Sequence, residues 1–221
     1  MRTLFIMNRK RDIVLALILT VFFISFAVVF TVFFKQLYYF DISYLNIEQY
    51  VSLDAETIKK NYDILIQYQS IFYQGELNLP DFVMSTTGRI HFEEVKRIFE
   101  AVQILCLFSG IISAVMIYHH VKQKEYGFLA LTSIFSIGIP SLIGLIASVD
   151  FNKAFVIFHK IFFRNNYWIF DYNTDPVIRI LPQDFFMHCF IMIILIVIVL
   201  SLISYLIYRK QRKEIIGTSK C

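Results

Sequence analysis

The chain alternates between apolar stretches and polar segments, and four of the apolar stretches are long enough to cross a bilayer. They cover about residues 13–34, 101–118, 128–149 and 190–208, and none of them contains a charged side chain. A helix needs roughly 20 apolar residues to cross a hydrocarbon core about 30 Å thick. The pattern predicts an all-α membrane protein with four transmembrane helices, arranged as a single integral membrane domain over residues 1–221.

Positive charges at the ends of these stretches predict their orientation. Lysine and arginine residues precede the first stretch, lie in the short loop between the second and third, and follow the fourth. These residues are Arg2, Arg9, Lys10, Arg11, Lys122, Lys124, Arg209, Lys210, Arg212 and Lys213. Short, positively charged segments remain on the cytoplasmic side. Both termini are therefore expected inside, and residues 35–100 and 150–187 are expected outside.

Composition and motifs exclude several classes of function. Hydrophobic residues make up 57% of the chain, above the range of about 45–50% that is usual for soluble domains. The net charge of +4 is not gathered into a basic patch with aromatic residues, so no nucleic-acid partner is expected. The uncharged spans argue against a pump or a voltage sensor. No nucleotide-binding loop and no H-E-x-x-H sequence occurs, so neither a cofactor nor a metal is expected.

The first outer segment is predicted to contain two helices. Asp54 is placed to cap a helix whose apolar positions, Ile58, Tyr62 and Leu65, recur at helical spacing. This helix is expected to end near Gly75. A second helix is expected to begin at the Ser-Thr-Thr sequence of residues 85–87 and to continue directly into the second span.

The second outer segment carries an apolar stripe. Phe151, Phe155, Phe158 and Phe162 follow one another at spacings of three and four, and basic residues occupy other faces. This pattern predicts a helix that lies in the plane of the membrane interface. The aromatic residues that follow, Trp168 among them, are typical of the headgroup layer.

Two histidines are placed where lipid esters lie. His91 is in the segment that leads into the second span, and His159 is on the predicted interfacial helix. Imidazole takes up and returns a proton near neutral pH, so the pair is suited to acid–base chemistry at an ester. Each histidine could equally be an amphipathic anchor whose ring is satisfied by a carbonyl or by water. The outer segments contain no cysteine and no G-x-S-x-G sequence that would supply a covalent nucleophile.

Two passages of the sequence resemble a known family. One runs from Gly88 to Phe99 and contains His91, and the longer and more specific one runs from Phe158 to Phe186. With the order of the spans and the sizes of the loops, they resemble the bacterial lipoprotein intramolecular transacylase (Lit) family of four-helix integral membrane proteins.

The resemblance implies an enzyme of the bacterial cytoplasmic membrane whose active site is on the extracytoplasmic face. Its partners would be diacylglyceryl lipoproteins in the outer leaflet, and membrane lipid. The family's enzyme moves the sn-2 acyl chain from the glycerol oxygen to the α-amino group of the same lipoprotein cysteine, without a cofactor. His91 and His159 match the family's catalytic pair, and the roles of acid and base stay open between them.

Other residues of the two passages are candidates for contacting substrate or for supporting this site, and those of the second passage could either orient His159 or simply fold the loop. They are Arg89, Asn166, Trp168, Asp171 and Asp175. For Asp175, the proline that follows favours a structural turn.

Two further functions stay possible: a noncatalytic accessory or sensor protein that binds a lipid or a partner at its outer face, and a lipid hydrolase that uses water.

Overall fold

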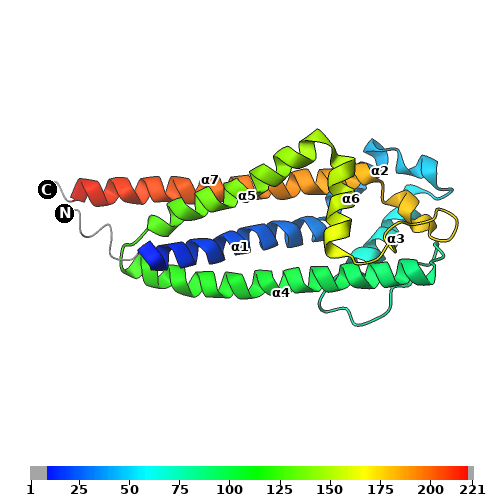
Figure 1. Cartoon of the computed structure of the whole chain (residues 1–221), viewed down its shortest axis with the longest axis horizontal. Coiled ribbons are helices and arrows are strands. Elements are labelled where there is room, and N and C mark those ends of the chain that lie inside the picture. The colour runs from blue at the N-terminus through cyan, green and yellow to red at the C-terminus, as the bar shows by residue number, and fades with distance from the viewer. Residues whose placement is uncertain (1–8, 219–221) are drawn as a thin grey trace. The chain divides into compact units, whose positions relative to one another are not determined.

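The structure is a computed structural model that describes residues 9–218, apart from a few side chains (residues 9, 139, 143, 146–148, 216 and 218). Arg2, one of the charges used to predict the orientation, lies outside the described residues. Within 9–218 the fold is all-helical and contains no strand (Figure 1). The helices are α1 (Arg9–Phe33), α2 (Lys35–Tyr44), η2 (Ile47–Tyr50), α3 (Ala55–Tyr68), α4 (Thr86–Lys122), α5 (Gly127–Val149), α6 (Phe151–Phe162), η3 (Pro176–Ile180) and α7 (Gln183–Thr218).

Three helices of the described chain are long and apolar enough to cross a membrane. They are Lys10–Phe33 in α1, Thr86–Lys122, which is all of α4, and Gln183–Ile215 in α7. The remaining predicted stretch forms α5, within which Gly127–Leu142 is a shorter apolar helix. The prediction of an all-α protein with membrane-spanning helices is confirmed, and the fourth span stays a prediction.

The described chain divides into two compact units. The first contains residues 9–28, 104–145 and 193–218. Its core forms where Leu15, Leu19 and Phe23 of α1 pack against Phe128 and Leu129 of α5. In the same unit, α4 approaches α1 closely at Gly110, where an added Cβ would lie 2.9 Å from the ring of Phe22. Small residues of this kind allow membrane helices to pack tightly.

The second unit contains residues 29–103 and 146–192, and its core is rich in tyrosine and phenylalanine. Tyr38 of α2 stacks on Tyr62 of α3 with ring centroids 3.7 Å apart, and Phe185 meets Tyr38 edge-on at 5.0 Å. The Tyr38 hydroxyl donates a hydrogen bond of 2.7 Å to the carbonyl of Ile180. The sequence did not predict α2, because its apolar and polar residues do not separate onto two faces at helical spacing.

Helix α3 begins as predicted but ends earlier. The Asp54 carboxylate accepts a hydrogen bond of 2.7 Å from the N–H of Thr57, and Ile58, Tyr62 and Leu65 are buried. The prediction that this helix reaches Gly75 is wrong, because α3 stops at Tyr68.

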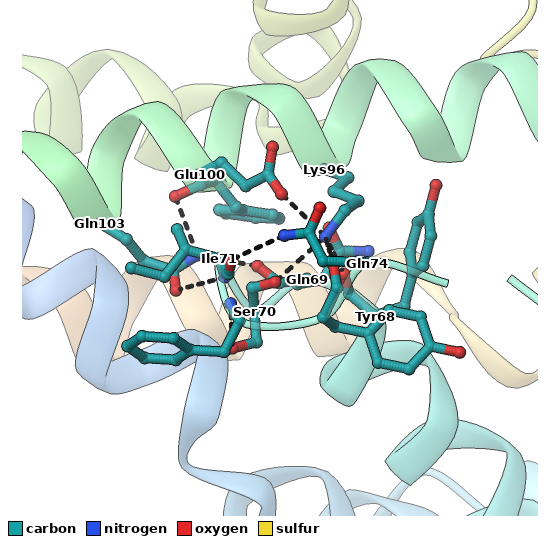
Figure 2. Close-up of polar contacts among 11 residues, drawn as sticks. Tyr68, Gln69, Ser70, Ile71, Gln74, Lys96, Glu100 and Gln103 are labelled. Atoms are coloured by element: carbon teal, nitrogen blue, oxygen red, sulfur yellow. Dashed lines mark hydrogen bonds and ion pairs between the residues drawn. The ribbon is translucent and has the colours of Figure 1, made fainter. Parts of the chain in front are cut away.

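The early stop follows from side chains of α4 that bond to the backbone after α3 (Figure 2). Lys96 Nζ donates to the carbonyls of Tyr68, Ser70 and Tyr73 at 2.7, 3.1 and 3.0 Å, and pairs with Glu100 at 2.8 Å. Gln103 Nε2 donates to the carbonyl of Gln69 at 2.7 Å, and its oxygen accepts from the N–H of Ile71. These partners replace the helical hydrogen bonds that residues 68–73 would otherwise make.

The helices that carry the two histidines form as predicted. Helix α4 runs without a break over 37 residues, about 55 Å, so it extends well beyond the apolar stretch 101–118. Its first turn is capped by Ser85, whose hydroxyl accepts from the N–H of Gly88 at 2.9 Å. Helix α6 is capped by Asp150, whose carboxylate accepts from the N–H of Lys153 at 3.0 Å. His91 therefore lies on the part of α4 that precedes the apolar stretch, and His159 lies in the last turn of α6.

Candidate active site

The structure brings His91 and His159 together. Their ring centroids are 6.0 Å apart and the ring planes are inclined by 35°. The two residues are only 5% and 9% exposed, so each ring is almost completely enclosed by protein. His159 is the buried residue of α6, whereas Phe158 and Phe162 of the predicted apolar stripe are about half exposed.

Aromatic side chains form the walls around the pair. His91 meets the rings of Phe163 and Phe170 at 4.7 and 5.4 Å, both edge-on. His159 lies against the rings of Phe155 at 4.2 Å and Trp168 at 4.7 Å. Such walls exclude water and lower the local dielectric constant, which strengthens every electrostatic interaction inside the site.

Burial keeps both imidazoles neutral. It lowers the pKa of His91 from its ordinary value of 6.5 to about 4, and the neighbouring His159 adds to this shift. The pKa of His159 is also lowered by burial, although its hydrogen bond to the carbonyl of Phe155 acts in the opposite direction. At neutral pH the site therefore contains two uncharged rings.

One hydrogen bond fixes the proton on His159. Its Nδ1 lies 2.8 Å from the carbonyl oxygen of Phe155. A carbonyl oxygen only accepts, so Nδ1 carries the hydrogen and Nε2 of the neutral ring has a free lone pair. For His91, Nδ1 is buried without a partner, and no contact within the described residues selects a tautomer.

The start of α4 is held by Asp175 from the second outer segment. Its Oδ1 accepts a hydrogen bond of 2.8 Å from the N–H of Ser85, and the residue is 3% exposed. A Cβ at Gly88 would overlap this carboxylate and would also lie 3.2 Å from the ring of Phe170. Glycine is thus required where α4 passes Asp175, one turn before His91.

A second polar contact joins the same two segments. Asn165 donates a hydrogen bond of 2.8 Å from Nδ2 to Oε1 of Glu94, and its carbonyl accepts from the indole N–H of Trp168 at 3.1 Å. The other carboxylate oxygen of Glu94, Oε2, is buried and has no hydrogen-bond partner. Glu94 follows His91 by three residues, so the two side chains lie on one face of α4.

The structure separates the predicted supporting residues into two groups. Trp168 contacts His159 and Asp175 holds the start of α4, so both lie at the site. Arg89 is exposed and donates to the carbonyl of Leu77 at 3.4 Å. Asp171 is exposed and accepts from the N–H of Asn173, and Asn166 is exposed as well. Within the described residues, no contact joins Arg89, Asn166 or Asp171 to either histidine.

The sequence did not predict that Glu94, Asn165 and three phenylalanines (Phe155, Phe163 and Phe170) lie at the site. Glu94 lies one turn from His91 in the first resembling passage. That spacing is the local feature of the sequence that could have indicated a place for Glu94 at the site. Among the described residues, no group of three or more His, Cys, Asp or Glu side chains is arranged to hold a metal ion.

Comparisons with known proteins agree with the all-helical membrane fold. The family model described as "Lipoprotein intramolecular transacylase Lit" matches residues 13–186. The structure is similar to the in meso structure of the membrane integral lipoprotein intramolecular transacylase Lit from Bacillus cereus, with a TM-score of 0.91 and 38% identity over 94% of this chain and 97% of that chain. No curated protein matches the chain.

Two variants of the Bacillus cereus protein, each with one histidine replaced, are also similar. The arginine variant has a TM-score of 0.87 and 37% identity over 96% of this chain and 95% of its own. The alanine variant has a TM-score of 0.86 and 38% identity over 94% of each chain. The chain is therefore a membrane-integral enzyme that belongs to the lipoprotein intramolecular transacylase (Lit) family.

Proposed function

We propose that this enzyme transfers the sn-2 acyl chain of a diacylglyceryl-cysteine to the α-amino group of the same lipoprotein cysteine. The product is an N-acylated lipoprotein with a lyso-glyceryl group. The observation that carries the proposal is the placement of His91 and His159, which come from separate helices and lie 6.0 Å apart in an enclosed aromatic site.

In the proposed reaction His159 is the base. Its Nε2 has a free lone pair because Nδ1 donates to Phe155. The α-amino nitrogen attacks the ester carbonyl, an N–C bond forms, and one N–H proton passes to Nε2. The bond from the acyl carbon to the glycerol oxygen then breaks, and the same proton passes from His159 to that oxygen. The proton that leaves the amine is thereby returned to the alcohol, and no other reactant is needed.

His91 has a different role in this proposal. A pKa of about 4 makes its imidazolium a rare species at neutral pH, so His91 is poorly suited to deliver a full proton. A neutral imidazole still carries one N–H, which can donate to the oxyanion of the tetrahedral intermediate. Fixed donors of this kind stabilise charge most effectively in a site that excludes water.

The intramolecular reaction suits an enclosed site. Nucleophile and ester belong to one substrate molecule, so the protein has to fold the substrate until the two groups meet. Correct placement alone is worth about 7–11 kcal/mol of the barrier in well-oriented intramolecular reactions.

We further propose four transmembrane spans, with both termini in the cytoplasm and the site on the outer face of the bacterial cytoplasmic membrane. The support comes from the lysine and arginine residues beside α1, between α4 and α5, and at the end of α7. Single cysteines introduced at Ser52 and Lys213, in a background without native cysteine, test the orientation. A membrane-impermeant thiol reagent applied to whole cells should label only the first.

The activity is tested by expressing the chain in a bacterium whose lipoproteins carry a diacylglyceryl group and a free α-amine. Tandem mass spectrometry of one lipoprotein's N-terminal peptide should show an acyl chain moved to the amine at unchanged total mass. The His91→Ala and His159→Ala variants should lose this shift. Free fatty acid and a lighter peptide would indicate a hydrolase, and an unchanged peptide beside folded protein would indicate an accessory role.

A further inference from the structure

The carboxylate of Glu94, a half-buried residue of α4, has one oxygen that is buried without a partner. One oxygen is held by Asn165 at 2.8 Å, whereas Oε2 is buried without any partner. No ion pair of Glu94 with a lysine or arginine occurs within residues 9–218. A buried acceptor left without a partner destabilises the folded protein, and more so when the group is charged. Exceptions of this kind call for an explanation, such as a ligand that completes the site.

The surroundings of Glu94 tie it to the reaction site. It lies on the face of α4 that carries His91, with about 5–6 Å expected between the Cβ atoms of residues three apart. Asn165, which holds Glu94, also accepts a hydrogen bond from Trp168, and Trp168 lies against His159 at 4.7 Å. Glu94 is therefore connected to both histidines, to one along its own helix and to the other through Asn165 and Trp168.

The substrate brings one group that suits a lone carboxylate oxygen. Its α-amino group has a pKa near 8, so it enters the site mostly as a cation and carries N–H donors in both protonation states. Positive charge develops on the same nitrogen when the amine attacks the ester. The histidines are neutral, and so neither of them can balance that charge.

We propose that Oε2 of Glu94 binds the α-amino group of the substrate's cysteine and holds it beside His159. This proposal rests on the proposed function, because it names the part of the same substrate that Glu94 recognises. The histidines are themselves enclosed, so the side chains that cover them have to move when substrate binds. The same movement opens Oε2 to the amine.

The test uses a lipopeptide that binds but does not react. Ether linkages in place of both glyceryl esters give a dialkylglyceryl-cysteine peptide that has no acyl group to transfer. Its affinity is compared with that of the same peptide lacking the α-amino group. Binding is followed by the fluorescence of Trp168, the chain's single tryptophan, which lies against His159.

The native enzyme should prefer the peptide with the amine by about tenfold or more, the range of a hydrogen bond to a charged group. Glu94→Gln keeps an acceptor for Asn165 and should lose most of this preference, while Glu94→Asp should retain part of it. Glu93→Gln is the matched control, because Glu93 is exposed and pairs only loosely with Arg97 at 4.0 Å. An undiminished preference in a folded Glu94→Gln protein would overturn the proposal.

A second measurement needs no variant. On the native enzyme, the preference should shrink as the pH rises above about 8 and the ammonium group loses its proton. A preference that does not change across this range would also overturn the proposal. Acyl transfer within the diacylglyceryl-cysteine peptide, which has the natural ester linkages, is measured on the same preparation. This measurement distinguishes failure of the Glu94 proposal from failure of the proposed function. Acyl transfer with no amine preference defeats the Glu94 site alone, and amine preference with no transfer defeats the proposed function.

Discussion

Asp175 accepts a hydrogen bond of 2.8 Å from the backbone N–H of Ser85 and thereby fixes the residue that caps α4. The helix that starts there carries His91 in its second turn, so the position of one histidine depends on a side chain of the other outer segment. The segment between α6 and η3 that provides Asp175 also contains Phe170, which contacts His91, and Trp168, which contacts His159. One carboxylate thus couples the start of α4 to the aromatic walls of the site.

The Asp175→Ala variant should be less stable than the native protein and should turn over more slowly. A buried backbone N–H loses a charged acceptor, which costs about 1–3 kcal/mol. The displaced start of α4 should lower kcat more than it raises KM, because His91 acts on the reacting atoms in the proposed mechanism. Thermal unfolding and steady-state kinetics check the two effects. Glu76→Ala, an exposed acid of the first outer segment, serves as control, and equal behaviour of the two variants would contradict the role given to Asp175.

Replacement of Gly88 by alanine should be damaging for a steric reason. The added Cβ would overlap the Asp175 carboxylate and press on Phe170, and overpacking of this kind costs about 1–3 kcal/mol. Both the thermal midpoint and acyl transfer should fall. Gly138→Ala is the matched control, since no atom lies within 4 Å of a Cβ built at that helical glycine. If the two variants unfold at the same temperature, the close approach of Asp175 to Gly88 does not exist in solution.

Much of this architecture was predictable because its signals are local. The cap at Asp54, the helix start after Ser85 and the apolar stretches are all patterns within a few residues, and the structure contains each of them. Contacts between distant residues were not predictable in the same way. Asn165 and Glu94 are 71 positions apart in the sequence, and nothing near either residue indicates the other.

The early end of α3 also results from contacts between residues that are distant in the sequence. Residues 69–73 have a pattern that allows a helix to continue, but Lys96 and Gln103, about 30 positions later, take over the backbone hydrogen bonds. The common depth of His91 and His159 suggested a pair, and the resemblance to a family implied that the two act in one site. Helix periodicity placed each histidine on its own helix and gave no information on whether the two helices meet.

Lys96→Met should destabilise the outer part of the protein. Methionine keeps much of the apolar stem but removes the donors to the carbonyls of Tyr68, Ser70 and Tyr73 and the ion pair with Glu100 (Figure 2). Because these carbonyls are partly buried, a loss of about 2 kcal/mol or more is expected. Hydrogen exchange of residues 68–74 should speed up. Lys153→Met removes only an ion pair with Asp150 that is open to solvent and contributes little to stability, so it should leave exchange in this loop unchanged.

The dependence of acyl transfer on pH follows from the neutral histidines. Burial lowers the pKa of His159 from its ordinary value of 6.5 and that of His91 to about 4, so both rings are mostly neutral as the pH falls from 8 to 7. In this range only the substrate amine, with a pKa near 8, gains a proton. A plot of log(kcat/KM) against pH should therefore rise between pH 7 and 8, with a slope close to one at pH 7 that falls to about one half at pH 8. A slope of two in that interval would mean that a catalytic imidazole titrates there as well.

Below pH 6.5 the same shifts predict a loss of stability. The unfolded chain binds protons at its histidines with an ordinary pKa of 6.5, whereas the folded protein resists protonation of His91 until about pH 4. Between these values the unfolded state binds more protons, so the free energy of unfolding falls as the pH is lowered through this window. His91→Phe keeps an aromatic ring without a titrating nitrogen. It should abolish acyl transfer and weaken the dependence of the unfolding temperature on pH between 6.5 and 4, and an unchanged dependence would show that His91 is not buried in solution.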